Sequence, residues 1–291
     1  MKRFLMMSTL LLAALLVGAQ TKITPKMKKG MKKTYVTECT ISNEFSQPVT
    51  ITQETVFEVI EATDEGYILD VYVTDVKNNS NDAESRIYSI ATEILKGVHT
   101  KYATDKDGKV TKVLEAEDIQ KRTDEMLNKV LEGISLPGGK TISELKKQLK
   151  LGVNEESLTE SLQISTSPLA LNGKTISTGT EEEYLNQSPG QLNLKMKRIY
   201  TVNDNGTIST SANIDMKKED IKKMLSDMLG DAISTDVFSE LGSLFDKANL
   251  QCTEQSTYTF GKDNWVKSIT SEMTTSAMGM SMSMKSKVTS K

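Results

Sequence analysis

The chain has 291 residues, 36 of them basic and 39 acidic, which gives a formal net charge of −3. This near balance argues against a protein whose whole surface binds nucleic acid, and the length suffices for one large domain or two small ones. Aromatic residues make up only 5% of the chain, with a single tryptophan, which disfavours a sugar-stacking cleft.

Residues 1–19 have the three parts of a secretory signal peptide. A positively charged start precedes a mostly apolar run at 4–17, and small residues form a cleavage site at 17–19. The apolar run is shorter than the roughly 20 residues that a membrane-spanning helix needs. We therefore predict a mature chain that begins at Gln20, with no transmembrane segment after cleavage and a periplasmic or secreted location. Residues 20–33 form a basic leader, expected to lie solvated ahead of the first strand.

Two periodicities predict the secondary structure of the mature chain. Period-two alternation with many β-branched residues predicts strands at 34–46, 48–61, 66–77, 98–104, 109–114, 174–185, 191–202, 206–215, 249–260 and 264–288. Apolar residues at helical spacing predict helices at about 82–96, 116–132, 141–150, 154–162, 217–229 and 235–247. Turn sequences of the Asp-Glu-Gly and Asp-Gly kind separate neighbouring strands.

Strands joined by hairpin turns, with helices in separate blocks, indicate an α+β fold. We expect a single domain over 34–291, in which a large curved antiparallel β-sheet is wrapped around helices as a half-barrel of the kind that carriers use. The halves 34–136 and 173–291 share an order of strands, helix and strand pair. An internal duplication and a coincidence of pattern both fit this likeness.

A search for catalytic and metal sites gives a negative prediction. His99 is the only histidine, which excludes a multi-histidine metal site, and nothing places a nucleophile beside it. The Asp-rich stretches at 105–109 and 203–206 lack the first and last ligands of a calcium loop and are interpreted as hairpin turns. We predict that the protein is not an enzyme and has no catalytic residue, metal or cofactor.

The two cysteines, Cys39 and Cys252, each lie in a strand-like run with apolar residues on the same face. Exported proteins can form disulfides, so a Cys39–Cys252 bridge is one interpretation if the two strands are neighbours. Two buried free thiols are the other, and only the Cα separation decides between them.

The last predicted strand contains an unusual series of methionines at every second position. Met278, Met280, Met282 and Met284 would all point to one face of a strand. Three interpretations compete: a core face packed on helices, the lining of a binding site for an acyl chain or other apolar ligand, and a soft-metal site for Cu(I).

Several short stretches carry a resemblance to known proteins. They are Lys29-Gly30 leading into Thr34-Tyr35, the hairpin strands that end at Val73–Val76, Tyr258–Phe260, Asn264–Ser268 and the methionine-rich end. In these the chain resembles a family of exported Bacteroidota proteins of unknown function. In architecture alone it is similar to periplasmic lipoprotein carriers of the LolA/LppX type, a likeness that implies a half-open sheet holding acyl chains. No cysteine follows the cleavage site, so the lipid attachment of bacterial lipoproteins is not expected.

Together these observations favour an exported, non-enzymatic binding or carrier protein for an apolar or lipidic ligand, with Met278, Met280, Met282 and Met284 as candidate contacts. The alternative is a structural or protein-interaction component of the cell envelope without a small ligand. Neither interpretation involves a nucleic-acid partner.

Overall fold

The computed structural model describes residues 20–44, 47–79, 96–131, 155–162, 164–186, 194–215, 251–277 and 280–291. Within these residues strands far outnumber helices. The strands are β1 (Thr21–Lys22), β2 (Lys32–Asn43), β3 (Val49–Ala62), β4 (Gly66–Asn78), β5 (His99–Asp105), β6 (Val110–Glu115), β7 (Thr175–Ile176), β8 (Glu181–Asn186), β9 (Leu194–Val202), β10 (Ile208–Asp215), β11 (Gln251–Phe260), β12 (Val266–Ala277) and β13 (Met280–Ser290). The helices are α3 (Glu117–Leu131) and α5 (Glu155–Ser161).

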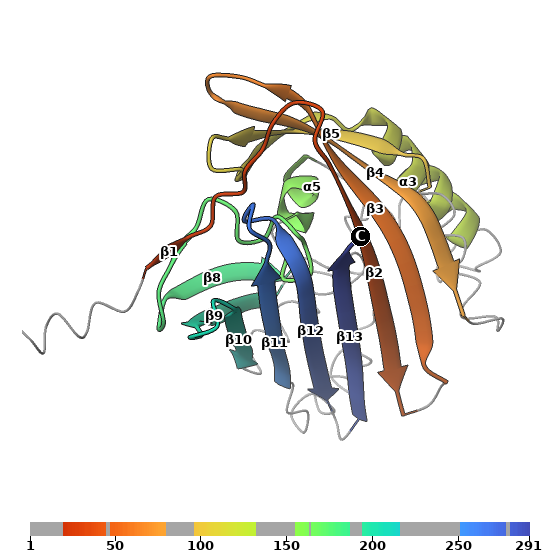
Figure 1. The fold of residues 1–291 in the computed structure, drawn as a ribbon. Coiled ribbons are helices and arrows are strands. Elements are labelled where there is room, and N and C mark those ends of the chain that lie inside the picture. The colour runs from red at the N-terminus through yellow and green to blue at the C-terminus, as the bar shows by residue number, and fades with distance from the viewer. Residues whose placement is uncertain are drawn as a thin grey trace, which may run out of the picture.

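One antiparallel sheet contains eleven of the strands, in the order β6-β5-β4-β3-β2-β13-β12-β11-β10-β9-β8 (Figure 1). The chain enters the sheet in the middle with β2 and steps to one edge at β6. It then re-enters at the opposite edge with β8 and steps back to the middle, where β13 pairs with β2. We call β2–β6 the N-terminal half-sheet and β8–β13 the C-terminal half-sheet.

The sheet bends into an open half-barrel, with α5 and the segment after it on the concave side (Figure 1). The strand period of two puts alternate side chains on opposite faces. In β11, for example, Cys252, Glu254 and Ser256 are buried, whereas Gln251 and Thr253 are exposed. The concave face is therefore the buried one and the convex face meets water.

An apolar core fills the concave side at one end of the sheet, which we call the closed end. Tyr35, Val59, Leu69, Tyr102, Ile208, Tyr258, Ile269 and Val288 contribute to it from the strands. Its cover consists of α5 and the irregular segment 164–176, through Leu158, Leu162, Leu169, Leu171 and Ile176. Burying these large side chains removes apolar surface from water, which is the main driving force for the fold.

The predicted α+β class is therefore wrong. The protein is mostly antiparallel sheet, and in the described part an irregular segment and one short helix cover the core where several amphipathic helices were expected. Helices predicted at 116–132 and 154–162 are confirmed as α3 and α5. The predictions at 141–150, 217–229 and 235–247, and all but the last residue of 82–96, lie outside the described residues.

Two predicted strands turn out to be two elements each. The stretch 264–288 is the hairpin β12–β13, in which Ala277 pairs with Met280. The stretch 174–185 is β7 and β8 with a turn between them, where Gly179 has a φ of 87° that favours glycine.

The Asp64-Glu65-Gly66 turn between β3 and β4 is confirmed, and the structure shows why glycine stands there. Gly66 pairs with Asp105 of β5. A Cβ atom on Gly66 would lie 1.9 Å from the backbone oxygen of Thr104, so only glycine allows the two backbones to approach this closely.

The predicted solvated leader, 20–33, is instead bound to the fold. Its residues 20–31, which we call the N-terminal strap, are bound to both half-sheets, and Lys32 and Lys33 begin β2. Strand β1 pairs with β7, and the side chain of Ile23 is 4% exposed within the core. Lys26 donates its backbone N–H to Asp263, and Gly30 donates its own to Val59. The strap thus joins the two half-sheets at the closed end.

Candidate functional site: the concave face of the sheet

A layer of polar side chains crosses the concave face of the C-terminal half-sheet. It consists of Arg198, Thr210, Glu254, Ser256, Ser271 and Ser286, all of them buried, and we call it the polar layer. On one side of it lies the core of the closed end, and on the other a second apolar cluster of Met196, Ala212, Cys252 and Met273. The polar layer therefore separates two apolar regions on the same face.

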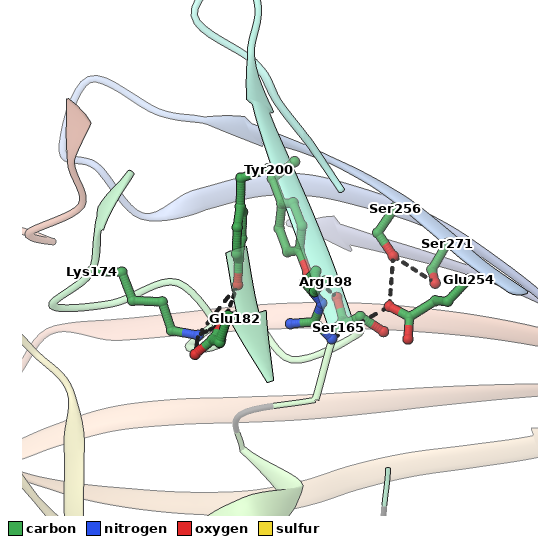
Figure 2. A network of polar contacts seen from close by, with 9 residues as sticks. Ser165, Lys174, Glu182, Arg198, Tyr200, Glu254, Ser256 and Ser271 are labelled. Atoms are coloured by element: carbon green, nitrogen blue, oxygen red, sulfur yellow. Dashed lines mark hydrogen bonds and ion pairs between the residues drawn. The ribbon is translucent and has the colours of Figure 1, made fainter. Parts of the chain in front are cut away.

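The polar layer contains a fully buried ion pair. Arg198 on β9 is 1% exposed and Glu254 on β11 is 4% exposed, and 3.5 Å separates Arg198 Nη2 from Glu254 Oε1. Both residues lie opposite Ala212 of β10, whose small side chain leaves room for the two long side chains to meet across it. Ser256 donates to the same Glu254 oxygen and to Ser271, which extends the layer across β12 (Figure 2).

A second charged group lies beside the first one, toward the edge of the sheet. Lys174 Nζ is 2.7 Å from both carboxylate oxygens of Glu182 on β8, and the Tyr200 hydroxyl donates to the same carboxylate (Figure 2). Glu182 also lies directly opposite Arg198 in the strand pairing. Four charges of balanced sign thus meet on the inner face of three strands and one loop.

The pKa values in this group follow from burial and from the two donors. Burial raises the pKa of the Glu182 carboxyl, but hydrogen bonds from Lys174 and Tyr200 outweigh it, so that the pKa lies below its ordinary value. Burial lowers the pKa of Lys174, because the interaction with Glu182 does not offset the lost hydration. The pKa of Tyr200 is raised, chiefly by burial. Glu182 is therefore held as an anion.

The second apolar cluster continues onto the N-terminal half-sheet through strand pairing. Met284 of β13 packs against the cluster and lies between Met273 and Ile41. Half-buried aliphatic and thioether side chains extend this surface across the middle of the sheet. We call Ile41, Ile51, Val73, Val76, Met282 and Met284 the apolar zone.

The apolar zone contains two of the four methionines singled out in the sequence. Met282 and Met284 occupy alternate positions of β13 and are half-buried on the concave face. Met280 is the first residue of β13, and its side chain is not described. Met278 lies outside the described residues, before β13 begins. The six residues of the zone therefore combine an expected pair with aliphatic partners that the sequence alone did not connect to it.

The proposed disulfide is excluded by the strand order. Cys39 lies on β2 and Cys252 on β11, with β13 and β12 between them. Three strand spacings of roughly 4.8 Å give about 14 Å, twice the Cα separation that a bridge tolerates. Both thiols are free, and burial raises the pKa of each. The prediction required neighbouring strands, which a sequence does not specify.

His99 lies on the convex face of β5 and is half exposed. Its Nδ1 is 2.8 Å from Asp70 Oδ2, and its ring stacks on Tyr72 with 4.3 Å between ring centres. Within the described ranges no cluster of three or more His, Cys, Asp or Glu could hold a metal ion. The stretch 105–109 is the predicted hairpin turn, in which Asp105 accepts hydrogen bonds from the backbone of Asp107 and Lys109.

Sequence reasoning missed the buried Arg198–Glu254 pair, although a signal for it exists. Arg198 shares its strand face with Met196 and Tyr200, and Glu254 shares its face with Cys252 and Tyr258. A charged residue at an apolar position of a strand requires a buried partner of opposite charge. Two such positions of opposite sign predict a pair, but not which strands bring them together.

Comparisons with known proteins give little beyond this geometry. No family model matches the chain, and no curated protein is similar to it in sequence, so the likeness to exported Bacteroidota proteins stays a prediction. Among the helices that the structure describes, none is long and apolar enough to cross a membrane. A lipovitellin chain, from work on lipid–protein interactions in lipovitellin, is similar with a TM-score of 0.43 and 9% sequence identity. The match covers 91% of this chain and 25% of the lipovitellin chain, so this chain spans about a quarter of that protein's length.

Proposed function

We propose that the protein is an exported, non-enzymatic binding or carrier protein for an apolar or lipidic ligand, which it holds against the apolar zone. The observation that carries the proposal is the uneven burial of the concave face. Side chains at the closed end, such as Leu69 and Ile269, have no exposed surface. Those of the apolar zone, such as Ile51 and Met282, are of the same chemical kind and remain partly exposed.

The composition of the apolar zone suits a flexible chain more than a rigid aromatic ligand. Aliphatic groups and two thioethers provide a surface that adapts to an acyl chain, since methionine is unbranched and polarisable. The convex side of the same strands is polar, as Thr40, Thr52 and Lys285 show. An apolar ligand would therefore find its complementary surface on one face of the sheet.

The direct test is native mass spectrometry of protein expressed from the full sequence and purified without detergent. We expect an additional mass that an organic solvent extracts as lipid, and displacement of a bound fluorescent fatty acid by that extract. N-terminal sequencing of the same sample tests the export prediction, which requires Gln20 as the first residue. Repeated absence of bound lipid, together with no binding of the fluorescent fatty acid, contradicts the carrier and favours an interaction protein of the envelope.

Substitution of the two methionines tests the location of the ligand. Met282→Gln with Met284→Gln keeps the shape of each side chain and removes its apolar end. We expect fatty-acid affinity to fall by about 5–30-fold, which corresponds to about 1–2 kcal/mol of lost apolar contact. The matched control is Lys285→Gln with Lys287→Gln, two exposed residues on the convex face of the same strand. Equal losses in the two variants would contradict a ligand on the concave face.

A further inference from the structure

Four lysines form an exposed group at the closed end of the sheet. Lys26, Lys28 and Lys29 lie on the N-terminal strap, and Lys262 lies on the turn between β11 and β12. All four are exposed, and the ion pairs found among the described residues include none of them. We call this group the basic surface.

Backbone contacts hold the strap against the turn that carries Lys262. Lys26 donates its N–H to the Asp263 carbonyl at 2.8 Å, and the Trp265 indole donates to the Lys26 carbonyl at 3.0 Å. Asn264 adds a third contact by donating to the Thr24 carbonyl at 3.1 Å. The lysines of the strap and of the turn therefore belong to one fixed surface although more than 230 residues separate them in sequence.

The carboxylates next to the basic surface are already neutralised. Asp263 accepts from Lys33 at 2.6 Å, and the Trp265 backbone also donates to it. Burial raises the pKa of Asp263, but these bonds outweigh it and keep the pKa below its usual range. Asp107 likewise forms an ion pair with Lys22, whose Nζ lies 2.7 Å from Asp107 Oδ2. The carboxylates of Asp263 and Asp107 therefore do not neutralise the four exposed lysines.

Several lysines on the strands of the sheet are arranged differently. They pair with acidic residues on neighbouring strands, as in Lys101–Glu115, Lys197–Glu181 and Lys285–Glu272. The closed end also has exposed acidic residues, Glu61 at the end of β3 and Asp64 and Glu65 in the β3–β4 turn. The positive charge is thus local to the strap and the turn beside it, on a chain that is acidic overall.

We propose that the basic surface docks the protein on an anionic phospholipid bilayer. The four cations are all lysines, which act as point charges on flexible stems, and none of the four can form the bidentate contacts that arginine makes in specific carboxylate or nucleic-acid recognition. Lipid phosphates form a diffuse array that requires charge and no fixed geometry. The lysines lie on coil and turn segments that backbone contacts hold together at the closed end.

This docking is independent of the proposed ligand and fixes an orientation. From Lys33, just after the strap, to Ile41 in the apolar zone, β2 rises about 26 Å at roughly 3.3 Å per residue. A bilayer bound at the closed end would leave the apolar zone on the far side of the molecule.

Vesicle co-sedimentation tests the proposal. Protein expressed from the full sequence and purified from the soluble fraction is mixed with vesicles of phosphatidylcholine alone, or with 30% phosphatidylglycerol by composition. The tested variant carries Lys26→Gln, Lys28→Gln, Lys29→Gln and Lys262→Gln. The control variant carries Lys77→Gln, Lys197→Gln, Lys285→Gln and Lys287→Gln, which changes the net charge equally on the strands of the sheet.

We expect binding only to the anionic vesicles and its loss at high salt, because surface charges are screened. A lysine near an anionic membrane contributes roughly a fivefold change in affinity. The variant with four lysines replaced should therefore bind at least a hundredfold more weakly, while the control variant retains its binding. Equal losses in both variants, or salt-insensitive binding to neutral vesicles, would overturn the proposal. Tighter binding to DNA or RNA than to the vesicles, removed by the same four substitutions, would also overturn it. Circular dichroism of both variants checks that each is folded.

Discussion

The two half-sheets have the same plan and differ in what they bury. Each begins with a three-stranded meander, β2-β3-β4 or β8-β9-β10, and resumes after a long intervening segment with further antiparallel strands. In the N-terminal half-sheet the buried concave side chains are apolar or hydroxyl-bearing, as with Val59, Leu69 and Thr100. In the C-terminal half-sheet Arg198 and Glu254 are buried at equivalent depth.

The difference shows that a sheet of this kind accepts charges on its inner face when the partner comes from another strand. Burying an isolated ion is strongly unfavourable, and a paired one is tolerated only with additional hydrogen bonds. Polar neighbours come from the same strands, with Ser256 on β11 and Tyr200 on β9, and from the adjacent strand β12 with Ser271. The stability of the C-terminal half-sheet should therefore depend on the pairing of its buried charges. The stability of the N-terminal half-sheet should depend on how closely its side chains pack.

The largest expected effect comes from breaking the buried pair. Arg198→Met removes the cation that faces the buried carboxylate of Glu254, so we expect the free energy of unfolding to fall by about 4 kcal/mol in a urea titration. Adding Glu254→Met should restore most of this stability, because a buried pair and an apolar replacement differ little in energy. A double variant as unstable as the single one would contradict the pairing argument.

A somewhat smaller loss is expected from a cavity in the N-terminal half-sheet. Leu69 of β4 has no exposed surface. Leu69→Ala should lower the free energy of unfolding by about 3 kcal/mol, since it removes apolar contacts and leaves a void. No second substitution beside Leu69 on the concave face should restore this stability in the way that Glu254→Met restores it for Arg198→Met. Such a rescue would show that the two half-sheets do not differ in this respect.

The Glu182 group should add a pH dependence that belongs to the C-terminal half-sheet. Because the folded-state pKa of Glu182 lies below its ordinary value near 4.5, its contribution is complete above that pH and is lost as the pH falls further through the folded-state pKa. Glu182→Gln should cost about 1 kcal/mol at pH 7, a modest value because the side chain is 34% exposed. Its stability should change less between pH 7 and 3 than that of the original protein.

The control for this measurement is Glu183→Gln, which alters an exposed residue on the opposite face of the same strand. It should follow the original protein across the pH range. A parallel pH profile for Glu182→Gln and the original protein would indicate that Glu182 is not held as an anion by Lys174 and Tyr200.

The smallest effect concerns the cysteines. Two free thiols on non-adjacent strands predict that a reductant leaves the unfolding midpoint unchanged. Thiol titration of denatured, unreduced protein should count two reactive groups per chain. A count of zero in protein that stays monomeric on a non-reducing gel would require strands β2 and β11 to be neighbours and would contradict the strand order itself.

The strands of the fold were largely predictable, and their neighbours were not. Alternation placed β2, β3, β4, β10 and β11 to within a few residues, because each has one wet and one buried face. It could not show that β13 returns to pair with β2, because pairing across the whole chain leaves no local signal. The same limit explains the incorrect expectation for Cys39 and Cys252.

The candidate site was predictable only in its local part. Met282 and Met284 share a face by spacing alone, but Ile41 and Met273 become their neighbours through pairing with other strands. The expectation that several helices cover the sheet was wrong for a related reason. An amphipathic stripe indicates that a segment packs against something, and it does not identify which face of which element it covers.

The pairing of β2 with β13 has a consequence for how the protein is made. Val36 of the first long strand pairs with Thr289 of β13, which is synthesised long after it. The inner edge of β2 therefore stays unsatisfied until β13 has been made, and the nascent chain cannot complete its central ladder one half at a time. Such high contact order predicts slow folding and a vulnerable β2 edge in the newly made polypeptide. A chaperone that shields this edge would be most valuable in the interval between the emergence of β2 and the arrival of β13.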